Sequence, residues 1–578
     1  MGDTNYWARR VGRRRLLRTG ALGGVGIAAA ALIGCGGGDD EEQTPAAVAT
    51  TAATAAGGAA ATATPAASST EPQSGGTLII PIAAEPPHLD PSGTLAYGLH
   101  TPIAPVYSRL VRTVWSTEAQ HNGDFTLQPD LAEEWEVVDP QTFVFRLRQG
   151  AQWHDVAPVS GRVVDAEDIK IALDHYRSEG AHRSAYSPVA EVTTPDAQTI
   201  SVKMTQPFAI FLETLSNSVR HMFPREALER EGGLEATPVI GSGAFLFDSF
   251  QRGDRFVSKR NPNYFLEGFP YLDGYEIRFI PDASTRIAGF RAGQLDYVGL
   301  GSWDAAREVL GTNPEAVHEE TVPAHSTFAP AMNLNKPPFD DERVRRGMSL
   351  AMDRNATVEA LFSGRGISGW GVPWVFAQDE PWTEEQLGPW ITRFDPAEAK
   401  KLLSAAGYED GFKTEMKFFA YSEVMESQIQ LFQADMLANL GIEVQLAPLE
   451  YAGWFEGFTG MKWDGMAWGF QIGTSATTDD FMYSNLNSAS PANYYYVKDP
   501  QIDALTDQIR GVSDLEERRA LVRDVHAIDA DKVYRLPAPQ GNGHAMVNPR
   551  VAGGTPPLLY RAWSTYGSAA LTKMWVTA

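Results

Sequence analysis

Residue types that could perform catalysis are scattered along this chain of 578 residues rather than grouped. Among the 11 histidines, some stand near an acidic residue, such as His88 with Asp90 and His154 with Asp155, but neither of these pairs has metal-site spacing. Gly241-Ser242-Gly243 lacks the spacing of a nucleophile elbow. We therefore expect a protein that is not an enzyme and that uses no metal or cofactor.

Cysteine has a clearer chemical use, and it occurs once, at Cys35. A basic segment at 9–18 precedes an uncharged apolar run at 21–34, which ends in small residues beside the thiol. That order is typical of an export signal, and the run is shorter than the about 20 residues of a membrane span. A thiol at the cleavage site can be acylated, so 1–34 resembles a bacterial lipoprotein signal peptide. The alternative is an uncut N-terminal membrane anchor.

Both interpretations place the remaining chain outside the cytoplasm, in the periplasm or on the cell surface, and held at a membrane. The segment Gly12–Arg18 fits a twin-arginine export motif, a route that carries folded cargo. The basic region of an ordinary secretory signal has the same composition. Both export routes therefore stay open.

The charge balance is strongly acidic, with 72 Asp and Glu against 48 Lys and Arg and a net charge of −24. Such a surface repels nucleic acid, which we exclude as a partner. A single cysteine allows no internal disulfide, so stability must come from a large core. The length exceeds what one core usually serves, and predicts two or three lobes.

Low-complexity sequence at 35–75, rich in Ala and Thr and without aromatic residues, predicts a disordered linker. The folded body begins near residue 76 and mixes α and β patterns. Residues 142–148 alternate as a strand does, and Asp165 and Asp395 are typical helix N-caps. A further helix is predicted at 428–440.

Aromatic residues gather in glycine-rich sequence between residues 370 and 496. Trp463 and Trp468 are separated by Asp-Gly-Met-Ala, and Tyr494 and Tyr495 follow in a run of three tyrosines. Each aromatic residue taken singly is more typical of a core. Together, in turn-like sequence, they favour the walls of a solute-binding cleft.

Several motifs occur in an order that is similar to one family, the extracytoplasmic solute-binding proteins of peptide, opine and nickel ABC importers. The matching segments are Glu85–Pro91, Gln128–Trp135, Phe143–Gly150, Trp153–Asp155, Val164–Asp168, Ile240–Phe245, Arg260–Phe265, Arg291–Asp296, Met332–Asn335, Pro337–Asp341, Val344–Arg346 and Ala351–Arg354. Their number and order carry the resemblance, which runs from about residue 76 to about residue 540.

The resemblance implies an α/β, two-lobed periplasmic-binding-protein fold of type II, with a hinge of two strands. It assigns 76–115, 236–323 and 531–578 to lobe I. An extra subdomain at 116–235 is inserted into lobe I, and 324–530 forms lobe II. A monomer that captures a peptide or other small polar solute and delivers it to an ABC permease is the implied function. A membrane-anchored sensor or chaperone that reuses the fold is the alternative.

In the family, solute contacts come from the loop after the opening motif, from the hinge, and from the stretch that begins Trp-Gly. The corresponding residues here are Leu95, Tyr97, Phe328, Trp463, Trp468, Gln471, Asp479, Tyr494 and Tyr495.

One position departs from the family pattern. Many peptide binders place an aspartate three residues after that tryptophan, where it pairs with the ligand's amino group, but this chain has Gln471. Glutamine donates and accepts hydrogen bonds without neutralising a charge. Either Asp479 or Asp480 takes over, or the solute is not an ordinary peptide, and an oligosaccharide would suit the tryptophans.

Overall fold

The computed structural model divides into two units, Met1–Ala67 and Ser68–Ala578. It describes residues 71–94, 97–113, 126–217, 219–323, 328–369, 383–420, 422–470, 478–553 and 570–577. Cys35, the predicted signal and nearly all of the linker therefore lie outside the described residues. In the described ranges, no helix combines the length and the apolar character that crossing a membrane requires.

The first lobe is built on a sheet of order β1-β10-β9-β8. β1 (Thr77–Ile82) pairs in parallel with β10 (Gly274–Phe279), although nearly 200 residues separate them. The remaining regular elements here are α2 (Tyr97–Ile103), η2 (Ala104–Val106), β2 (Val111–Thr113), β3 (Leu127–Pro129), β8 (Phe245–Gln251), β9 (Arg255–Arg260), β20 (Val551–Ala552), η5 (Ala570–Thr572) and β21 (Trp575–Val576).

An antiparallel sheet of order β4-β5-β7-β6 forms the inserted subdomain. Its elements are β4 (Ala132–Asp139), β5 (Thr142–Leu147), α3 (Ala166–Ser178), α4 (Arg183–Tyr186), β6 (Val189–Asp196), β7 (Thr199–Met204), α5 (Phe211–Ser216), α6 (Arg225–Glu229) and η3 (Gly233–Glu235). Its buried side chains join those of the first lobe in one continuous hydrophobic cluster. The subdomain is therefore an extension of the first lobe's core.

A three-stranded sheet completes the first lobe with chain from near the C-terminus. β19 (Gly543–Val547) lies between β11 (Tyr297–Leu300) and β12 (Val317–Thr321) and is antiparallel to both. The helices α7 (Ala283–Arg291) and α8 (Trp303–Thr312) supply apolar side chains to a separate small cluster beside this sheet.

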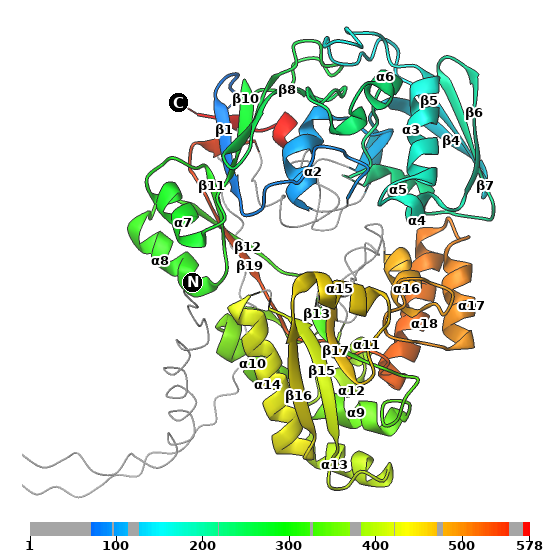
Figure 1. Ribbon diagram of the computed structural model, residues 1–578, viewed down its shortest axis with the longest axis vertical. Helices are drawn as coiled ribbons and strands as arrows, with labels where there is room; N and C mark the ends of the chain where they lie inside the picture. Colours follow the sequence, from blue (N-terminus) through cyan, green and yellow to red (C-terminus); the bar gives the residue numbers. More distant parts are fainter. Residues whose placement is uncertain are drawn as a thin grey trace, which may run out of the picture. The chain divides into compact units, whose positions relative to one another are not determined.

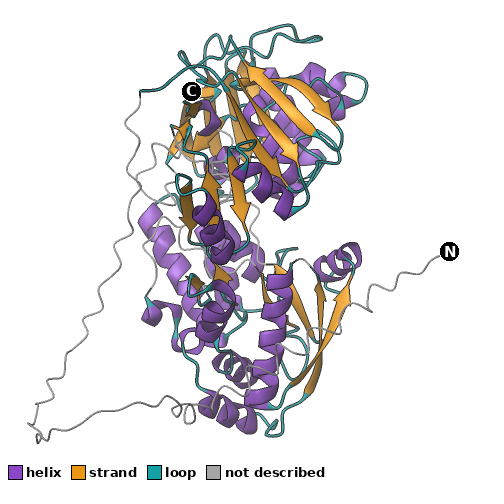
Figure 2. Ribbon diagram, turned by 90° about the vertical axis from the view of Figure 1, so that its left-hand side faces the viewer, coloured by secondary structure: helices purple, strands orange, loops and turns teal. Residues whose placement is uncertain are grey.

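The second lobe has its own sheet, of order β13-β17-β15-β16, and its own core. β13 (Phe328–Met332) is antiparallel to β17 (Met466–Phe470), whereas β15 (Lys413–Phe419) runs parallel to β17 and to β16 (Glu443–Leu449). The other elements are α9 (Glu342–Leu350), α10 (Arg354–Phe362), β14 (Gly366–Ile367), α11 (Glu384–Leu387), α12 (Pro389–Thr392), α13 (Pro396–Ala405), α14 (Glu423–Leu440), α15 (Tyr451–Thr459), α16 (Thr478–Leu486), α17 (Pro500–Ile509), α18 (Leu515–Lys532) and β18 (Gln540–Gly541). Figures 1 and 2 show helices and strands mixed in both lobes.

Local signals place several of these elements where the sequence predicts them. Asp165 caps α3 and forms a capping box with Asp168, and Asp395 caps α13. α14 begins earlier than the predicted residue 428, because Ser422 accepts a hydrogen bond from the backbone N–H of Met425 and so caps it.

The return of the chain to the first lobe lies near β18, which pairs with β14. Leu536 and Ala538 are fully buried in the second core, beyond the predicted lobe boundary at residue 531. The lobes also touch away from these strands, where the backbone N–H of Ala209 donates to the carbonyl of Arg510 at 2.7 Å.

Candidate functional site

The polar motifs of the first lobe form buried structural networks. Asp168 is fully buried and accepts hydrogen bonds from Arg162, Arg225 and the indole of Trp153. A buried carboxylate that is paired in this way holds three chain segments together. These contacts explain the Trp-His-Asp and helix-cap motifs without any role for a solute.

Asp296 and His154 have comparable roles. Asp296 accepts from the guanidinium of Arg550 at 2.6 Å and from the backbone N–H of Ile79 at 2.8 Å. The ring of His154 lies 3.1 Å from the carbonyl of Gly243, and burial lowers its pKa to about 4. A Cβ added to Gly243 would lie 2.5 Å from the carbonyl of Pro105, so only glycine fits there. The Gly-Ser-Gly motif is therefore a packing motif.

The structure describes the predicted solute-binding residues to different extents. Leu95 and Gln471 lie outside the described residues. Tyr97 opens α2 and Asp479 lies in α16, but their side chains are not described. Among the described residues, no group of three or more His, Cys, Asp or Glu has metal-binding geometry.

The predicted tryptophans belong to the interior of the second lobe. Trp468 is 0% exposed and Trp463 is 4% exposed, and the ring of Trp463 stacks on Phe458 with centroids 6.2 Å apart. Tyr495 is also fully buried. In this arrangement a solute would touch Trp468 only after displacing its neighbours, so burial favours a packing role for it.

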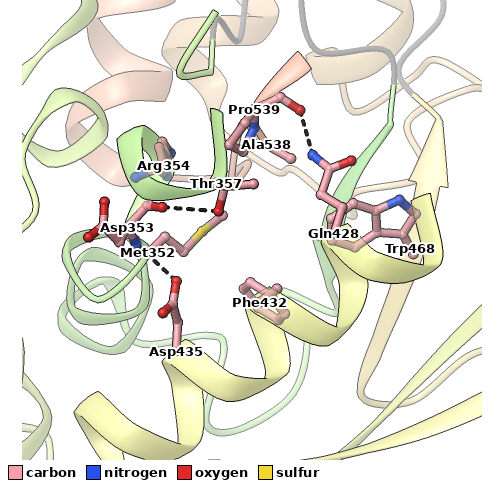
Figure 3. Close-up of a pocket in the computed structure, with 10 residues that line it drawn as sticks. All are labelled: Met352, Asp353, Arg354, Thr357, Gln428, Phe432, Asp435, Trp468, Ala538 and Pro539. Carbon is pink, nitrogen blue, oxygen red and sulfur yellow. Dashed lines mark hydrogen bonds between the residues drawn. The ribbon is translucent and has the colours of Figure 1, made fainter. Parts of the chain in front are cut away.

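Figure 3 shows a cavity beside Trp468, between α10, α14 and the segment Ala538–Pro539. Its volume is about 10 Å³, which is the room that one water molecule needs. Asp435 points toward α10 and accepts from the backbone N–H of Asp353 at 2.9 Å. Burial raises the pKa of this carboxyl group. The cavity is too small for the expected solute.

A larger aromatic surface lies at one edge of the second lobe's sheet. The parallel strands β15, β16 and β17 all end there, at Phe419, Leu449 and Phe470, and the antiparallel strand β13 begins there at Phe328. In open α/β sheets, ligands bind outside the carboxyl ends of the strands. This edge is therefore the expected place for a solute.

Helix α15 follows β16 at this edge and carries four aromatic side chains. Trp454 and Phe458 are buried and stack on each other at 5.1 Å, whereas Tyr451 and Phe455 are 56% and 41% exposed. Figure 1 shows α15 beside the ends of these strands. The helix thus buries one aromatic face and presents the other.

The rings of α15 pack against aromatic residues from the neighbouring strands and loops. Trp454 packs on Phe419 at 4.4 Å, and Phe455 lies 6.0 Å from Phe470. Tyr494, which the sequence places in the site, packs on Phe458 at 5.1 Å and is partly buried. Phe328 packs near Phe419 at 6.1 Å. Two of the predicted residues therefore belong to this edge.

Gly469 explains the glycine of the Trp-Gly motif. A Cβ added at this position would lie 2.1 Å from the ring of Phe458. Only glycine lets Phe458 lie flat against β17, and Phe458 in turn supports Trp454 and Tyr494. The motif therefore shapes the aromatic edge through packing.

A comparison with known protein families gives a match over more than half of the chain. A family model described as bacterial extracellular solute-binding proteins, family 5 Middle, matches residues 126–493. The chain belongs to this family. The resemblance noted in the motifs is thereby confirmed, and the activity of family 5 proteins is solute binding rather than turnover.

Individual family 5 relatives are distant. Glutathione-binding protein GsiB of Salmonella paratyphi A is 28% identical over 336 residues, which cover 57% of this chain and 62% of that relative. The match thus spans less than two thirds of GsiB. Heme-binding protein A of Haemophilus influenzae is 26% identical over 481 residues, covering 78% of this chain and 84% of the relative.

Solved structures confirm the two-lobed α/β fold. The periplasmic binding protein DppA of Helicobacter pylori, in complex with the peptide STSA, superposes with a TM-score of 0.69 at 21% identity. The match covers 88% of this chain and 99% of that chain. At this identity the likeness shows the fold and leaves the solute open.

Sequence reasoning missed Tyr451 and Phe455, the most exposed rings of the edge. The available signal was the segment 451–458, in which aromatic residues recur at helical spacing among glycines. That pattern shows which rings share a helix, but not which of them point away from the core.

Proposed function

We propose that the protein is the substrate-binding lipoprotein of an ABC importer, which captures a peptide or similar polar solute between its lobes and delivers it to a membrane permease. Solute binding favours the closed state, because contacts to both lobes form together only in that state. The permease then recognises the closed shape. The solute leaves chemically unchanged.

The exposed pair Tyr451 and Phe455 is the observation that supports this proposal best. A singly exposed aromatic ring is common in soluble proteins, whereas neighbouring exposed rings form an apolar patch of the kind that marks ligand-binding grooves. These two rings lie 5.8 Å apart at the strand ends where α/β folds bind ligands. A solute that covers them would remove apolar surface from water on both sides.

The anchor is the second part of the proposal. Acylated Cys35 would hold the protein at the membrane, and the segment 35–75 would serve as a flexible tether. A tether raises the effective concentration of the binding protein near its permease. Electrophoresis of cells labelled with an alkyne fatty acid tests this part: Cys35→Ala should abolish labelling, and labelling that persists would contradict the anchor.

The solute class follows from Gln471 and from the relatives. Those relatives are named for glutathione, heme and di- or tripeptides, so the family tolerates varied solutes. A glutamine at the position where many peptide binders carry an aspartate favours a solute without a free ammonium group there. A peptide remains the first candidate, and an oligosaccharide that stacks on Tyr451 and Phe455 is the second.

Native mass spectrometry of the protein purified from its source tests the proposal directly. We expect one bound solute per chain. The double variant Tyr451→Ala with Phe455→Ala should lose it, while keeping its melting temperature. Phe394→Ala is the matched control, since Phe394 is 46% exposed in the same lobe but outside the aromatic edge. Equal solute retention in both variants would refute the assignment of the edge.

A second variant tests the solute's charge. Gln471→Asp should strengthen binding of tripeptides with free amino groups if the site is peptide-like, and weaken binding of a neutral solute. Isothermal titration with tripeptides and with neutral oligosaccharides distinguishes these outcomes. Unchanged affinity for both classes would exclude position 471 from the site.

A further inference from the structure

The loop that precedes α2 is held by histidine side chains. Segment Pro91–Thr94 leads directly to Leu95 and Tyr97, two of the residues that the sequence predicts to contact the solute. The ring nitrogen Nε2 of His182 lies 3.0 Å from the carbonyl of Pro91, and Nε2 of His100 lies 2.7 Å from the carbonyl of Thr94. Both ends of this short segment are therefore hydrogen-bonded to imidazoles.

The chemistry of the partners fixes which ring nitrogen carries the proton. A carbonyl oxygen can only accept, so Nε2 donates in both histidines. In a neutral imidazole, Nδ1 is then an acceptor. Nδ1 of His182 faces the guanidinium of Arg220, and Arg can only donate. Nδ1 of His100 lies 3.1 Å from Nε2 of His221, which must therefore be the donor.

Two parallel relays result, and both end on the same segment. One runs from Arg220 through His182 to the Pro91 carbonyl, and the other from His221 through His100 to the Thr94 carbonyl. All four donor side chains are at most 4% exposed. Water cannot replace their hydrogen bonds, so each relay fixes its carbonyl in position.

The electrostatics keep the relays in this state. Burial lowers the pKa of His100 to about 4, and burial together with the nearby Arg220 places the pKa of His182 well below its ordinary value. Both imidazoles are therefore neutral near pH 7, as the relay polarity requires. Tyr176 holds the far end by donating from its hydroxyl to the carbonyl of His221 at 2.7 Å.

A separate contact holds the middle of the segment. The backbone N–H of Ala181 donates to the carbonyl of Ser92 at 2.9 Å. Gly180 has a φ of +74°, and a Cβ added there would lie 2.4 Å from that carbonyl. The inserted subdomain therefore supplies the residues that hold this loop, directly or through a histidine. They are Gly180, His182, Arg220 and His221.

We propose that His100 and His182 are positioning residues for solute binding, which act by fixing segment Pro91–Thr94 through these two relays. The proposal rests on the proposed function, because it assumes that the loop leading to Tyr97 contacts the solute. It assigns a role to the inserted subdomain: the subdomain sets the position of a solute-contact loop that belongs to the first lobe.

Glutamine substitution tests the polarity of the relay. A glutamine side chain offers one amide donor and one carbonyl acceptor, as a neutral imidazole does, whereas leucine offers neither. We expect His100→Leu to raise amide hydrogen exchange in residues 91–100 and to weaken tripeptide binding by about tenfold, the order expected for lost buried hydrogen bonds. His100→Gln should restore both measurements to near the values of the unmodified protein.

A second experiment uses glycine variants, which leave the histidines unchanged and so test the proposal even if His100→Leu does not fold. Gly180→Ala should press on the Ser92 carbonyl and weaken tripeptide binding. Gly150→Ala is the matched control, since Gly150 has a similar φ of +77° but nothing within 4 Å of an added Cβ. Equal effects of the two glycine variants on binding would overturn the proposal.

The two measurements also separate this proposal from the proposed function. If His100→Leu leaves exchange in 91–100 unchanged, or His100→Gln fails to restore it, the relays do not position the loop. If exchange rises but tripeptide affinity stays constant, the loop is not a solute contact and the positioning role is refuted. A third outcome is that amide exchange in residues 91–100 follows the expected pattern but the unmodified protein binds no tripeptide. In that case the assignment of a peptide as the solute is wrong, and the loop has no role in peptide binding.

Discussion

The inserted subdomain and the sheet edge of the second lobe use polar and aromatic residues in different ways. The inserted subdomain buries charged and imidazole groups that are hydrogen-bonded within the protein, as Asp168 and His182 illustrate. In the second lobe, aromatic rings accumulate at the sheet edge, and Tyr451 and Phe455 stay exposed. Groups that are fully satisfied inside the protein have nothing left to offer a solute. The unsatisfied surface is therefore the better guide to binding.

This contrast also separates the family motifs by role. Most motif residues in the first lobe hold distant chain segments together, as Asp296 does for Ile79 and Arg550. Exposed rings such as Tyr451 lie outside the recognised motifs. A motif that defines a fold and a surface that selects a solute are thus largely different sets of residues.

Asp168→Ala should have the largest effect on stability. It would leave Arg162 and Arg225 without their most buried partner, and breaking such a pair costs about 3–5 kcal/mol. Urea unfolding measures the loss. Asp174→Ala is the control, because its ion pairs with Lys170 and Arg177 are about one third exposed and each contributes about 1 kcal/mol or less. Similar losses for both variants would contradict the contrast between buried and surface pairs.

Acid should destabilise the first lobe more than the second. Burial lowers the folded-state pKa of His100 and His154 to about 4 from the ordinary 6.5, and lowers those of His182 and His221 well below it. Between pH 6.5 and 4 the unfolded chain binds more protons, so stability falls as pH falls through this window. Each such group contributes up to about 1.4 kcal/mol per pH unit.

Scanning calorimetry at pH 7 and pH 4.5 checks this difference between the lobes. Among the described residues of the second lobe, the comparable group is His526, whose pKa burial also lowers to about 4. We expect the transition of the first lobe to move to lower temperature further than that of the second. Equal shifts of the two transitions would refute the prediction.

Gly469→Ala should cost about 1–3 kcal/mol, as overpacking of a core does. The added methyl group would displace the ring of Phe458 and, through it, Trp454. Loss of solute binding should accompany the loss of stability. Gly457→Ala is the control on α15, where nothing lies within 4 Å, and it should stabilise the helix slightly. Solute titration and thermal unfolding of both variants provide the measurements.

Arg518→Gln should have the smallest effect on stability, but it tests whether an ion pair between the two lobes restrains them. Arg518 pairs with Glu213 of the subdomain at 3.2 Å, and both side chains are less than one fifth exposed. Because glutamine can still donate a hydrogen bond to Glu213, we expect a loss of only about 1 kcal/mol in stability, together with a larger mean radius in small-angle scattering. A radius that stays unchanged would show that the pair does not restrain the lobes.

Sequence predicted what depends on local chemistry. Asp165 and Asp395 cap helices because capping needs only a few consecutive residues, and the strand at 142–147 follows from alternation. The burial of Trp468 could not be predicted, because it depends on Phe432 and on the segment at Ala538, which are distant in sequence. The histidine relays could not be predicted from the sequence for the same reason, since each relay joins residues from separate parts of the chain.

The position of β19 has a consequence for how the protein is made. Residues 543–547 supply the middle strand of a sheet whose other strands were translated more than 200 residues earlier. Protein synthesis proceeds at about 5–20 residues per second. After β11 and β12 are synthesised, tens of seconds therefore pass before the strand that pairs with both of them is made. The second lobe, which is continuous from Phe328 to Ala538, can fold during that time. Biogenesis of the first lobe is therefore completed last, although its first strand is made first.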